Sequence, residues 1–256
     1  MKQYAAGFIG AGNMGGALLS AIAGKTKNLA VYDKDTAKAA SADAEVVSPE
    51  KLAKESRFVF LGVKPGIVAT VAGQISQYLD ADTVVVSMAA GVPLTTLVRW
   101  SKTNKVIRIM PNTPVAVGQG MTLYSLATGV TALDESEFLT LMAPTGKVLK
   151  LDEPLIDAGM ALSGCGPAYV YLFIEALADG AVRCGLPRET AMRCAVQTVL
   201  GAAAMLESSG RHPGELKDAV CSPGGTTIEG VLALEQRGFR AAAAAGVTAA
   251  FDKLKR

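Results

Sequence analysis

Three glycines near the start of the chain have the spacing of a dinucleotide-binding loop. Gly10, Gly12 and Gly15 follow a short apolar run over residues 4–9 and open a helical stretch that reaches about residue 23. In such a loop the first glycine permits a tight turn, the second lets a pyrophosphate approach the backbone, and the third allows close helix packing. Free N–H groups at the start of the helix attract the phosphates. The pattern therefore indicates a cofactor site, with an ordinary tight turn as the alternative.

Two charged residues at the end of the second apolar run bear on the choice of cofactor. Asp33 closes the run over residues 29–32, and Lys34 follows it. A carboxylate at this position binds the ribose hydroxyls of NAD and repels a 2′-phosphate. Lys34 has the opposite preference because its ammonium group can pair with that phosphate, and Asp33 can alternatively cap the next helix. The residues alone leave the choice between NADH and NADPH open.

Small and polar residues follow three further apolar runs. The clusters are Val63-Lys64-Pro65, Met88-Ala89-Ala90-Gly91 and Met110-Pro111-Asn112-Thr113-Pro114. Open α/β sheets bind ligands at the carboxyl ends of their strands, so the three clusters together predict the rim of one crevice. Small residues there leave room for a flat nicotinamide ring, and Asn112 and Thr113 offer polar contacts. Taken singly, each cluster is equally typical of a surface turn.

A second glycine-containing loop, SPGGTT over residues 222–227, precedes a helical stretch near the end of the chain. Gly224 and Gly225 stand ahead of the helix, and Thr226 and Thr227 occupy its first turn, so backbone N–H groups converge on a small anion. The helix dipole adds about 0.3–1 kcal/mol at an exposed site. We expect a carboxylate here, because the first loop already serves the dinucleotide. A simple glycine-rich helix cap is the alternative.

The elements that must position these residues change in character along the chain. Through residue 152, continuously apolar runs at 4–9, 29–32, 58–63, 83–86, 106–109, 121–126 and 147–151 alternate with short helical stretches. Such runs are typical of a parallel sheet covered on both faces. We predict an α/β domain over residues 1–152, a doubly wound sheet of the Rossmann type.

Residues 153–256 instead predict an all-α domain. The stretch AYVYLFIEALADGAV after Pro167 is apolar nearly all the way round, and only Glu175 and Asp179 interrupt it. A helix without a polar face must be covered on all sides, often by another chain. We therefore expect this domain to form the core of a homodimer.

Composition excludes several classes of function. Of 256 residues, 50% are hydrophobic and 19% charged, which is ample for a core and too apolar for a disordered chain. The net charge of +2 signals no nucleic-acid or membrane partner. A single histidine, His212, and four widely spaced cysteines predict no metal site. Reduced thiols and the absence of a signal-peptide pattern indicate a cytoplasmic protein.

Five segments in order along the chain resemble the pyrroline-5-carboxylate reductase family, which makes L-proline. They are FIGAGNMGGAL, LGVKP, VIRIMPNTP, LSGCGPAYVYLFIEALADGAVRCGLPR and ELKDAVCSPGGTTIEGVLALEQRGFR. The resemblance implies a Rossmann domain followed by a helical dimerisation domain, in a dimer or a ring of dimers. It also implies hydride transfer from NADPH, or less favourably NADH, to the ring C=N of 1-pyrroline-5-carboxylate.

The resemblance also implies roles for individual residues. The pyrophosphate would be held by Ile9, Gly10, Ala11, Gly12, Asn13 and Met14. The path from adenosine to nicotinamide would be lined by Val63, Lys64, Pro65, Ala89, Ala90 and Gly91. The substrate's carboxylate or ring would be bound by Gly225, Thr226 and Thr227, with the Thr227 hydroxyl closest to the ring nitrogen. Two departures stand out: Asp33 leaves the cofactor preference open, and Ala219 stands where some members have Asn.

The chemistry agrees with the scarcity of acid–base residues. Hydride addition to a protonated cyclic imine needs orientation over the nicotinamide more than a strong acid. A hydroxyl such as that of Thr227 suffices as relay or orienter. His212 is then expected to be structural. The rivals are a β-hydroxyacid dehydrogenase, disfavoured because residues 163–182 contain no catalytic Lys, and a non-catalytic NAD(P) sensor.

Overall fold

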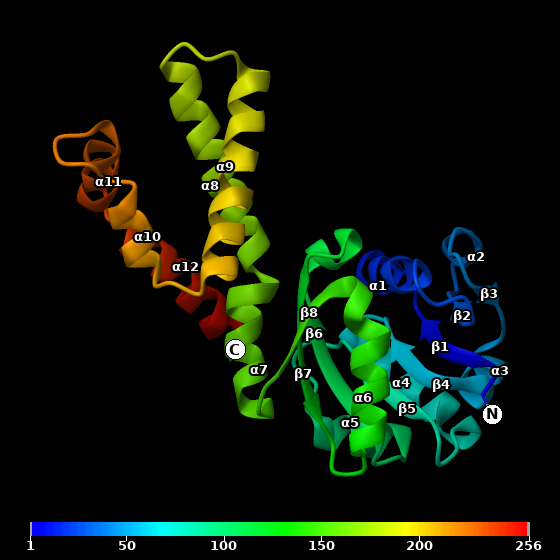
Figure 1. Ribbon diagram of the computed structural model, residues 1–256. Helices are drawn as coiled ribbons and strands as arrows, with labels where there is room; N and C mark the ends of the chain where they lie inside the picture. The colour runs from blue at the N-terminus through cyan, green and yellow to red at the C-terminus, as the bar shows by residue number, and fades with distance from the viewer. Residues whose placement is uncertain (1, 255–256) are drawn as a thin grey trace. The chain divides into compact units, whose positions relative to one another are not determined.

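The computed structural model describes residues 2–254 and divides them into two compact units, residues 2–165 together with Leu254, and residues 166–253 (Figure 1). The first unit is an eight-stranded sheet with helices on both faces, and the second is wholly helical. The predicted fold class, a doubly wound α/β domain followed by an all-α domain, is therefore confirmed.

The strands follow the order β3-β2-β1-β4-β5-β6-β7-β8 across the sheet. Their bounds are β1 Tyr4–Ile9, β2 Leu29–Tyr32, β3 Glu45–Val46, β4 Ser56–Leu61, β5 Val84–Ser87, β6 Val106–Pro111, β7 Gly120–Leu126 and β8 Gly146–Lys150. All neighbours pair in parallel except β6 and β7, which are antiparallel. A parallel sheet throughout was expected. The single turn Thr113–Val117 between β6 and β7 is too short for a parallel crossover.

Two separate layers of apolar side chains cover the sheet. The helices of this unit are α1 Asn13–Ala23, α2 Thr36–Ala40, α3 Pro49–Glu55, α4 Pro65–Ile75, α5 Leu94–Ser101 and α6 Ala132–Met142. On one face α1 and α6 bury Leu18, Ile22 and Phe138 against the strands. On the other face α3, α4 and α5 do the same with Leu52, Val68 and Leu97. Each such side chain contributes about 1.5–3 kcal/mol when fully buried, so both layers stabilise the sheet whose strand ends carry the predicted site.

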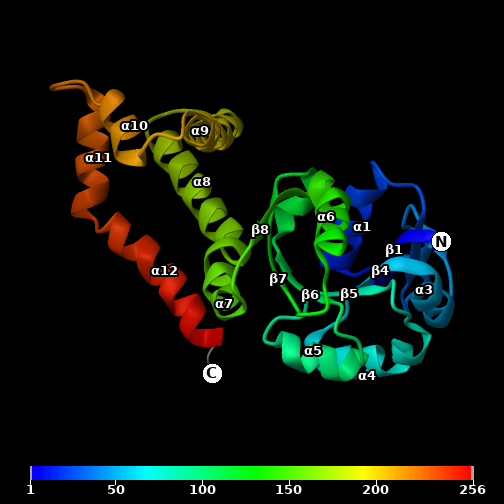
Figure 2. The same cartoon turned by 60° about the horizontal axis from the view of Figure 1, so that its bottom comes forward.

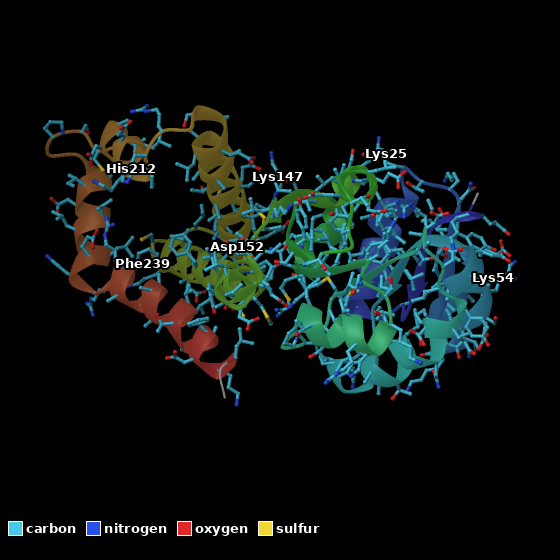
Figure 3. All side chains as sticks on the ribbon, turned by 90° about the horizontal axis from the view of Figure 1, so that it is seen from below. Lys25, Lys54, Lys147, Asp152, His212 and Phe239 are labelled. Carbon is cyan, nitrogen blue, oxygen red and sulfur yellow. The ribbon has the colours of Figure 1, made fainter. Side chains whose placement is uncertain are left out.

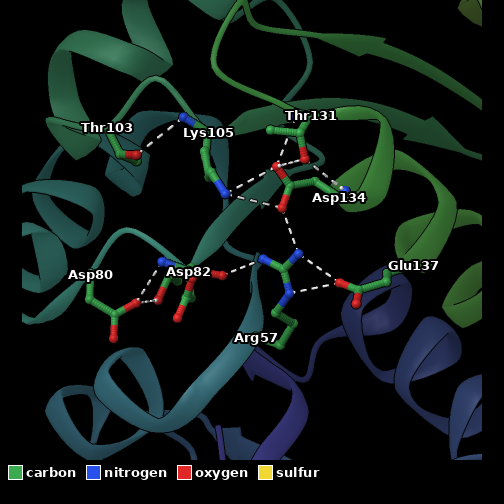
Figure 4. Close-up of polar contacts among 9 residues, drawn as sticks. Arg57, Asp80, Asp82, Thr103, Lys105, Thr131, Asp134 and Glu137 are labelled. Carbon is green, nitrogen blue, oxygen red and sulfur yellow. Dashed lines mark hydrogen bonds and ion pairs between the residues drawn. The ribbon is translucent and has the colours of Figure 1, made fainter. Parts of the chain in front are cut away.

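A charged cluster ties α6 to the edge of the sheet where β4 begins (Figure 4). Arg57 binds Asp134 at 2.5 Å and Glu137 at 2.6 Å, and it also donates to the carbonyl oxygen of Asp82. Lys105 lies 3.1 Å from the Asp134 carboxylate. Burial raises the pKa of Asp134, but hydrogen bonds from the Thr131 backbone and the Arg57 side chain outweigh it. The pKa of Asp134 is consequently well below its ordinary value.

The first unit continues past the predicted domain boundary at residue 152. A connector over residues 153–164 comprises a short turn Glu153–Leu155, helix α7 Ile156–Gly159 and a π-helical turn Met160–Gly164. Ile156 is fully buried with Met110 of β6 and Leu123 of β7. The compact units therefore divide after Cys165, because the connector packs on the sheet before the chain enters the helical unit.

The helical unit leaves most of its apolar surface uncovered. Its helices are α8 Gly166–Arg183, α9 Arg188–Ser209, α10 Pro213–Ala219, α11 Thr226–Gln236 and α12 Phe239–Leu254 (Figure 2). In the described part of this unit the buried hydrophobic residues are Ala178, Ala191 and Ala195, where α8 packs on α9. Leu172 of α8 is 68% exposed. By length and hydropathy the helical run 153–183 also qualifies as a candidate membrane span, which is weak evidence since a helix covered by a second chain has the same composition.

Candidate active site

The three glycines of the loop after β1 differ in their surroundings. Gly10 has φ 101°, and a β-carbon there would lie 2.6 Å from the carbonyl oxygen of Gly62. A β-carbon on Gly15 would lie 2.2 Å from the carbonyl oxygen of Gly10. Around Gly12, in contrast, no atom lies within 4 Å of that position. Gly10 and Gly15 are thus required by the fold, whereas Gly12 faces open space that a ligand can enter.

The start of α1 is suited to an anion. Gly12 is its N-cap and no side chain caps the helix, and its first turn contains no acidic residue. The first N–H groups of a helix have no partners within it, so an uncapped end offers them to a ligand together with the positive end of the dipole. Open space at Gly12 beside these donors fits the pyrophosphate of a dinucleotide.

The carboxylate of Asp33 holds the glycine loop in place. Its Oδ2 accepts the Ala11 N–H at 2.7 Å, and its Oδ1 accepts the Asp35 N–H at 2.9 Å. Asp35 rather than Asp33 caps α2, since its side chain accepts from the N–H of Ala37. The structure therefore shows a role for Asp33 that the sequence left out, while Lys34 beside it is exposed.

The other predicted cofactor residues lie at the carboxyl ends of adjacent strands. Val63, Lys64 and Pro65 follow β4, and Pro65 opens α4. Ala89, Ala90 and Gly91 follow β5, where Gly91 has φ 72°. Because β4 and β5 are parallel neighbours, both groups come to the same edge as the glycine loop. Sequence reasoning overlooked Gly62 at this edge, whose β-carbon would lie 2.6 Å from the Gly10 carbonyl oxygen.

Asn112 is buried directly after β6, and its amide is used within the chain. Its Nδ2 donates to the carbonyl oxygen of Ser163 at 2.9 Å, and its Oδ1 accepts the N–H of Met121 at 2.8 Å. A side chain bonded in this way holds the strand end, β7 and the connector together. The predicted contact of Asn112 with substrate stays a prediction beside this structural role.

The SPGGTT loop lies in the helical unit. Gly224 has φ 67°, the N–H of Gly225 donates to the Ser222 carbonyl oxygen at 3.0 Å, and α11 begins at Thr226 without a side-chain cap. Thr226 and Thr227 are exposed. The loop therefore presents free backbone donors and two hydroxyls, a set suited to a carboxylate or a ring nitrogen.

The one histidine has a structural partner, as the sequence predicted. His212 lies in the turn between α9 and α10 (Figure 3). Its Nδ1 accepts the N–H of Gly214 at 3.1 Å and so caps α10. In a neutral imidazole only one ring nitrogen can accept a proton, and in His212 that nitrogen, Nδ1, is already occupied by the Gly214 N–H.

Two family models match the chain. Residues 153–256 match a model described as pyrroline-5-carboxylate reductase dimerisation, and residues 5–91 match one described as NADP oxidoreductase, coenzyme F420-dependent. The dimerisation match covers the helices whose apolar faces the chain itself leaves exposed. The oxidoreductase match contains the glycine loop and the edge residues after β4 and β5.

Several known proteins to which the chain is similar are pyrroline-5-carboxylate reductases. A pyrroline-5-carboxylate reductase of Arabidopsis thaliana is 50% identical over 78% of this chain and 73% of its own length. One of Pisum sativum is 43% identical over 97% of this chain and 94% of its own length. A crystal structure of Plasmodium falciparum pyrroline carboxylate reductase with NADP bound has a TM-score of 0.89 and 33% identity, covering 100% of this chain and 98% of that chain.

Proposed function

The chain belongs to the pyrroline-5-carboxylate reductase family, and we propose how its own residues carry out the reduction. It is an NAD(P)H-dependent oxidoreductase of proline biosynthesis that converts the ring C=N of 1-pyrroline-5-carboxylate to the C–N bond of L-proline. The observation that carries this conclusion is the 43% identity over 97% of the chain, because that length takes in both units.

The dinucleotide, NADPH, is bound by residues 9–14. The backbone around Gly10 and Gly12 receives the pyrophosphate, which the open space at Gly12 and the uncapped start of α1 support. When bound, the reduced nicotinamide supplies the hydride. Asp33 keeps the loop in shape through the Ala11 N–H, and Lys34 is free to attract a 2′-phosphate. The residues 63–65 and 89–91 line the remainder of the cofactor path.

The substrate is held by the SPGGTT loop. Gly224 and Thr226 bind its carboxylate through backbone N–H groups, Gly225 keeps the turn closed through its N–H bond to Ser222 and lies beside the substrate, and the Thr227 hydroxyl hydrogen-bonds the ring nitrogen. Protonation of the nitrogen makes the imine carbon more electrophilic, so the chain has to orient the ring and supply few charges. Asn112, whose amide holds the strand end after β6 in place, is also proposed to contact the ring.

The protein acts as a homo-oligomer, which the matched dimerisation model and the exposed apolar helices support. We further propose a dimer or a ring of dimers, a cytoplasmic location, and a division of function in which residues 1–152 bind the cofactor and residues 153–256, including the connector that packs on the first unit, carry the substrate loop. The four cysteines are all free thiols, which suits a reducing compartment.

The decisive assay follows NADPH and NADH oxidation by the pure protein with pyrroline-5-carboxylate, and separately NADP+ and NAD+ reduction with a 3-hydroxy acid. Saturable oxidation of the reduced cofactor with the imine, and no reduction of the oxidised cofactor with the hydroxy acid, is the expected result. Cofactor binding without turnover of either would point instead to a sensor.

The role of Thr227 is tested with Thr227→Ala and Thr227→Ser. Loss of the hydroxyl should lower kcat/KM for the imine by about 10–100-fold, since a hydrogen bond to a charged group contributes about 1.5–3 kcal/mol. The serine variant keeps the hydroxyl and should retain most activity, and NADPH affinity should be unchanged in both. Wild-type kinetics in Thr227→Ala would show that the role is wrongly assigned.

A further inference from the structure

One buried charge in the sheet has no part in the reaction described so far. Arg108 lies in the middle of β6, is 4% exposed and is flanked along the strand by the buried Ile107 and Ile109. A guanidinium group buried in a sheet costs free energy unless partners compensate for its lost hydration. The groups that pair with Arg108 therefore indicate the role of this residue.

Both partners of Arg108 belong to the connector. Its Nη2 donates to Asp157 Oδ1 at 2.8 Å, and its Nη1 lies 3.4 Å from Glu153 Oε1. The same oxygen of Glu153 accepts the N–H of Leu94 at 2.6 Å, at the first residue of α5. Arg108 thus joins the connector's first turns to β6, and Glu153 joins them to α5.

A second tie to β6 lies at the other end of the connector. Asn112, at the end of the same strand, donates to the carbonyl oxygen of Ser163 at 2.9 Å. The π-helical turn Met160–Gly164 lies at this second tie, and such turns are rare and are found frequently at functional sites. Side chains of β6 and of the residue after it therefore bind the connector both near its start and near its end.

We propose that Arg108 is a positioning residue for the reduction, acting through the connector. Together with Asn112, Arg108 holds the connector against β6. Helix α8 begins at Gly166, directly after the connector. Every residue of the SPGGTT loop follows this segment in the chain, so the segment is the covalent link between the cofactor residues and the substrate loop. The proposal rests on the proposed function of that loop.

Stability alone does not account for the arrangement. Buried ion pairs are often no more stabilising than apolar residues of the same size, and Nε of Arg108 has no hydrogen-bond partner in the described chain. The Arg57 cluster shows the contrast: it also pairs an arginine with carboxylates (Figure 4), but none of the carboxylates that it binds belongs to the connector.

The test compares Arg108→Met with a control at the Arg57 cluster. Glu153 and Asp157 have side chains 28% and 39% exposed, so water can hydrate them when Arg108 is lost and the variant should fold. We expect kcat/KM for the imine to fall by about tenfold or more, because small misplacements can cost as much as a hundredfold. The NADPH dissociation constant should stay within about twofold. The control, Glu137→Gln, removes one partner of Arg57 and should keep wild-type kinetics.

A conservative variant and an exchange measurement complete the test. Arg108→Lys keeps the charge and should recover part of kcat/KM. Amide hydrogen exchange of residues 156–164 should rise in Arg108→Met while that of β1 and α1 is unchanged, and this readout is independent of the substrate's identity. Unchanged amide exchange in the connector would show that Arg108 does not hold the connector against β6. A loss of activity that only follows the fraction unfolded, or an equal loss of NADPH affinity, would overturn the positioning role. Absence of turnover in the wild type would instead refute the proposed function.

Discussion

At the residue scale, Gly12 and Gly15 of the same loop differ in why each has to be a glycine. A β-carbon at Gly15 collides with the Gly10 carbonyl oxygen at 2.2 Å, whereas one at Gly12 meets nothing within 4 Å. The φ of Gly12 is −68°, which any residue adopts. Gly15 therefore serves folding and Gly12 serves the ligand.

This difference predicts separable defects. Gly15→Ala should lower the free energy of unfolding by about 1–3 kcal/mol through overpacking. Gly12→Ala should change it by less than about 0.5 kcal/mol and instead weaken NADPH binding by about tenfold or more, since a methyl group then occupies the space of the pyrophosphate. Urea unfolding and cofactor titration measure the two effects. Full NADPH affinity in Gly12→Ala would place the pyrophosphate elsewhere.

Asp33 has a structural effect, through its bond to the glycine loop, and an electrostatic effect on a 2′-phosphate. The ratio of kcat/KM for NADPH to kcat/KM for NADH separates the two effects. Asp33→Asn weakens the hydrogen bond to the Ala11 N–H with both cofactors, but it also removes a negative charge that repels a 2′-phosphate. The ratio of kcat/KM for NADPH to that for NADH should rise by about fivefold, as expected for a partly exposed charge worth about 1 kcal/mol. Lys34→Ala should lower the same ratio. A ratio unaffected by either change would show that neither residue meets the 2′ position.

At the scale of elements, Asp134 connects the start of α6 to β4 and to Lys105 of the loop before β6. It accepts from Thr131 in a capping box and from Arg57, and its side chain is 2% exposed. The bonds to the charged form outweigh burial, so the pKa of Asp134 in the folded chain lies below the unfolded value. A lowered folded pKa stabilises the fold above the unfolded pKa, and this contribution is lost as pH falls through the folded pKa.

Asp134→Asn should therefore be destabilising in a pH-dependent way. At about pH 7 the free energy of unfolding should fall by about 3 kcal/mol, because two cations lose their buried partner. The difference from wild type should narrow below about pH 4, the ordinary range of an unfolded Asp. Urea unfolding at several pH values measures it, with Glu137→Gln as an exposed control. A difference independent of pH would mean that the charge of Asp134 contributes nothing.

At the scale of the whole molecule, the exposed apolar faces of α8 and α9 require a partner chain. Leu172→Glu on α8 introduces a charge at a side chain that is 68% exposed in the single chain. If a second copy covers it, the charge becomes buried and association is disfavoured by several kcal/mol. Light scattering should then give a mass shifted toward the 26.4 kDa of one chain. Leu133→Glu on α6, at 65% exposure, is the matched control and should leave the mass unchanged.

Structural features that depend on residues close together in the chain could be predicted from the sequence. The glycine spacing at 10, 12 and 15, the apolar strands and the SPGGTT loop before a helix each lie within a few residues of each other. Local conformation follows from such short-range patterns. They were sufficient to predict the fold class and, with the five resembling segments, the family and its reaction.

Contacts between distant residues were decided only by the tertiary structure. Asp33 bonds to Ala11 across 22 residues, and Arg108 bonds to Asp157 across 49. The division of the units after Cys165 depends on the burial of Ile156 against β6 and β7. No periodicity encodes these pairings, because they arise when strands and helices that are far apart in the chain pack together and bring their side chains into contact.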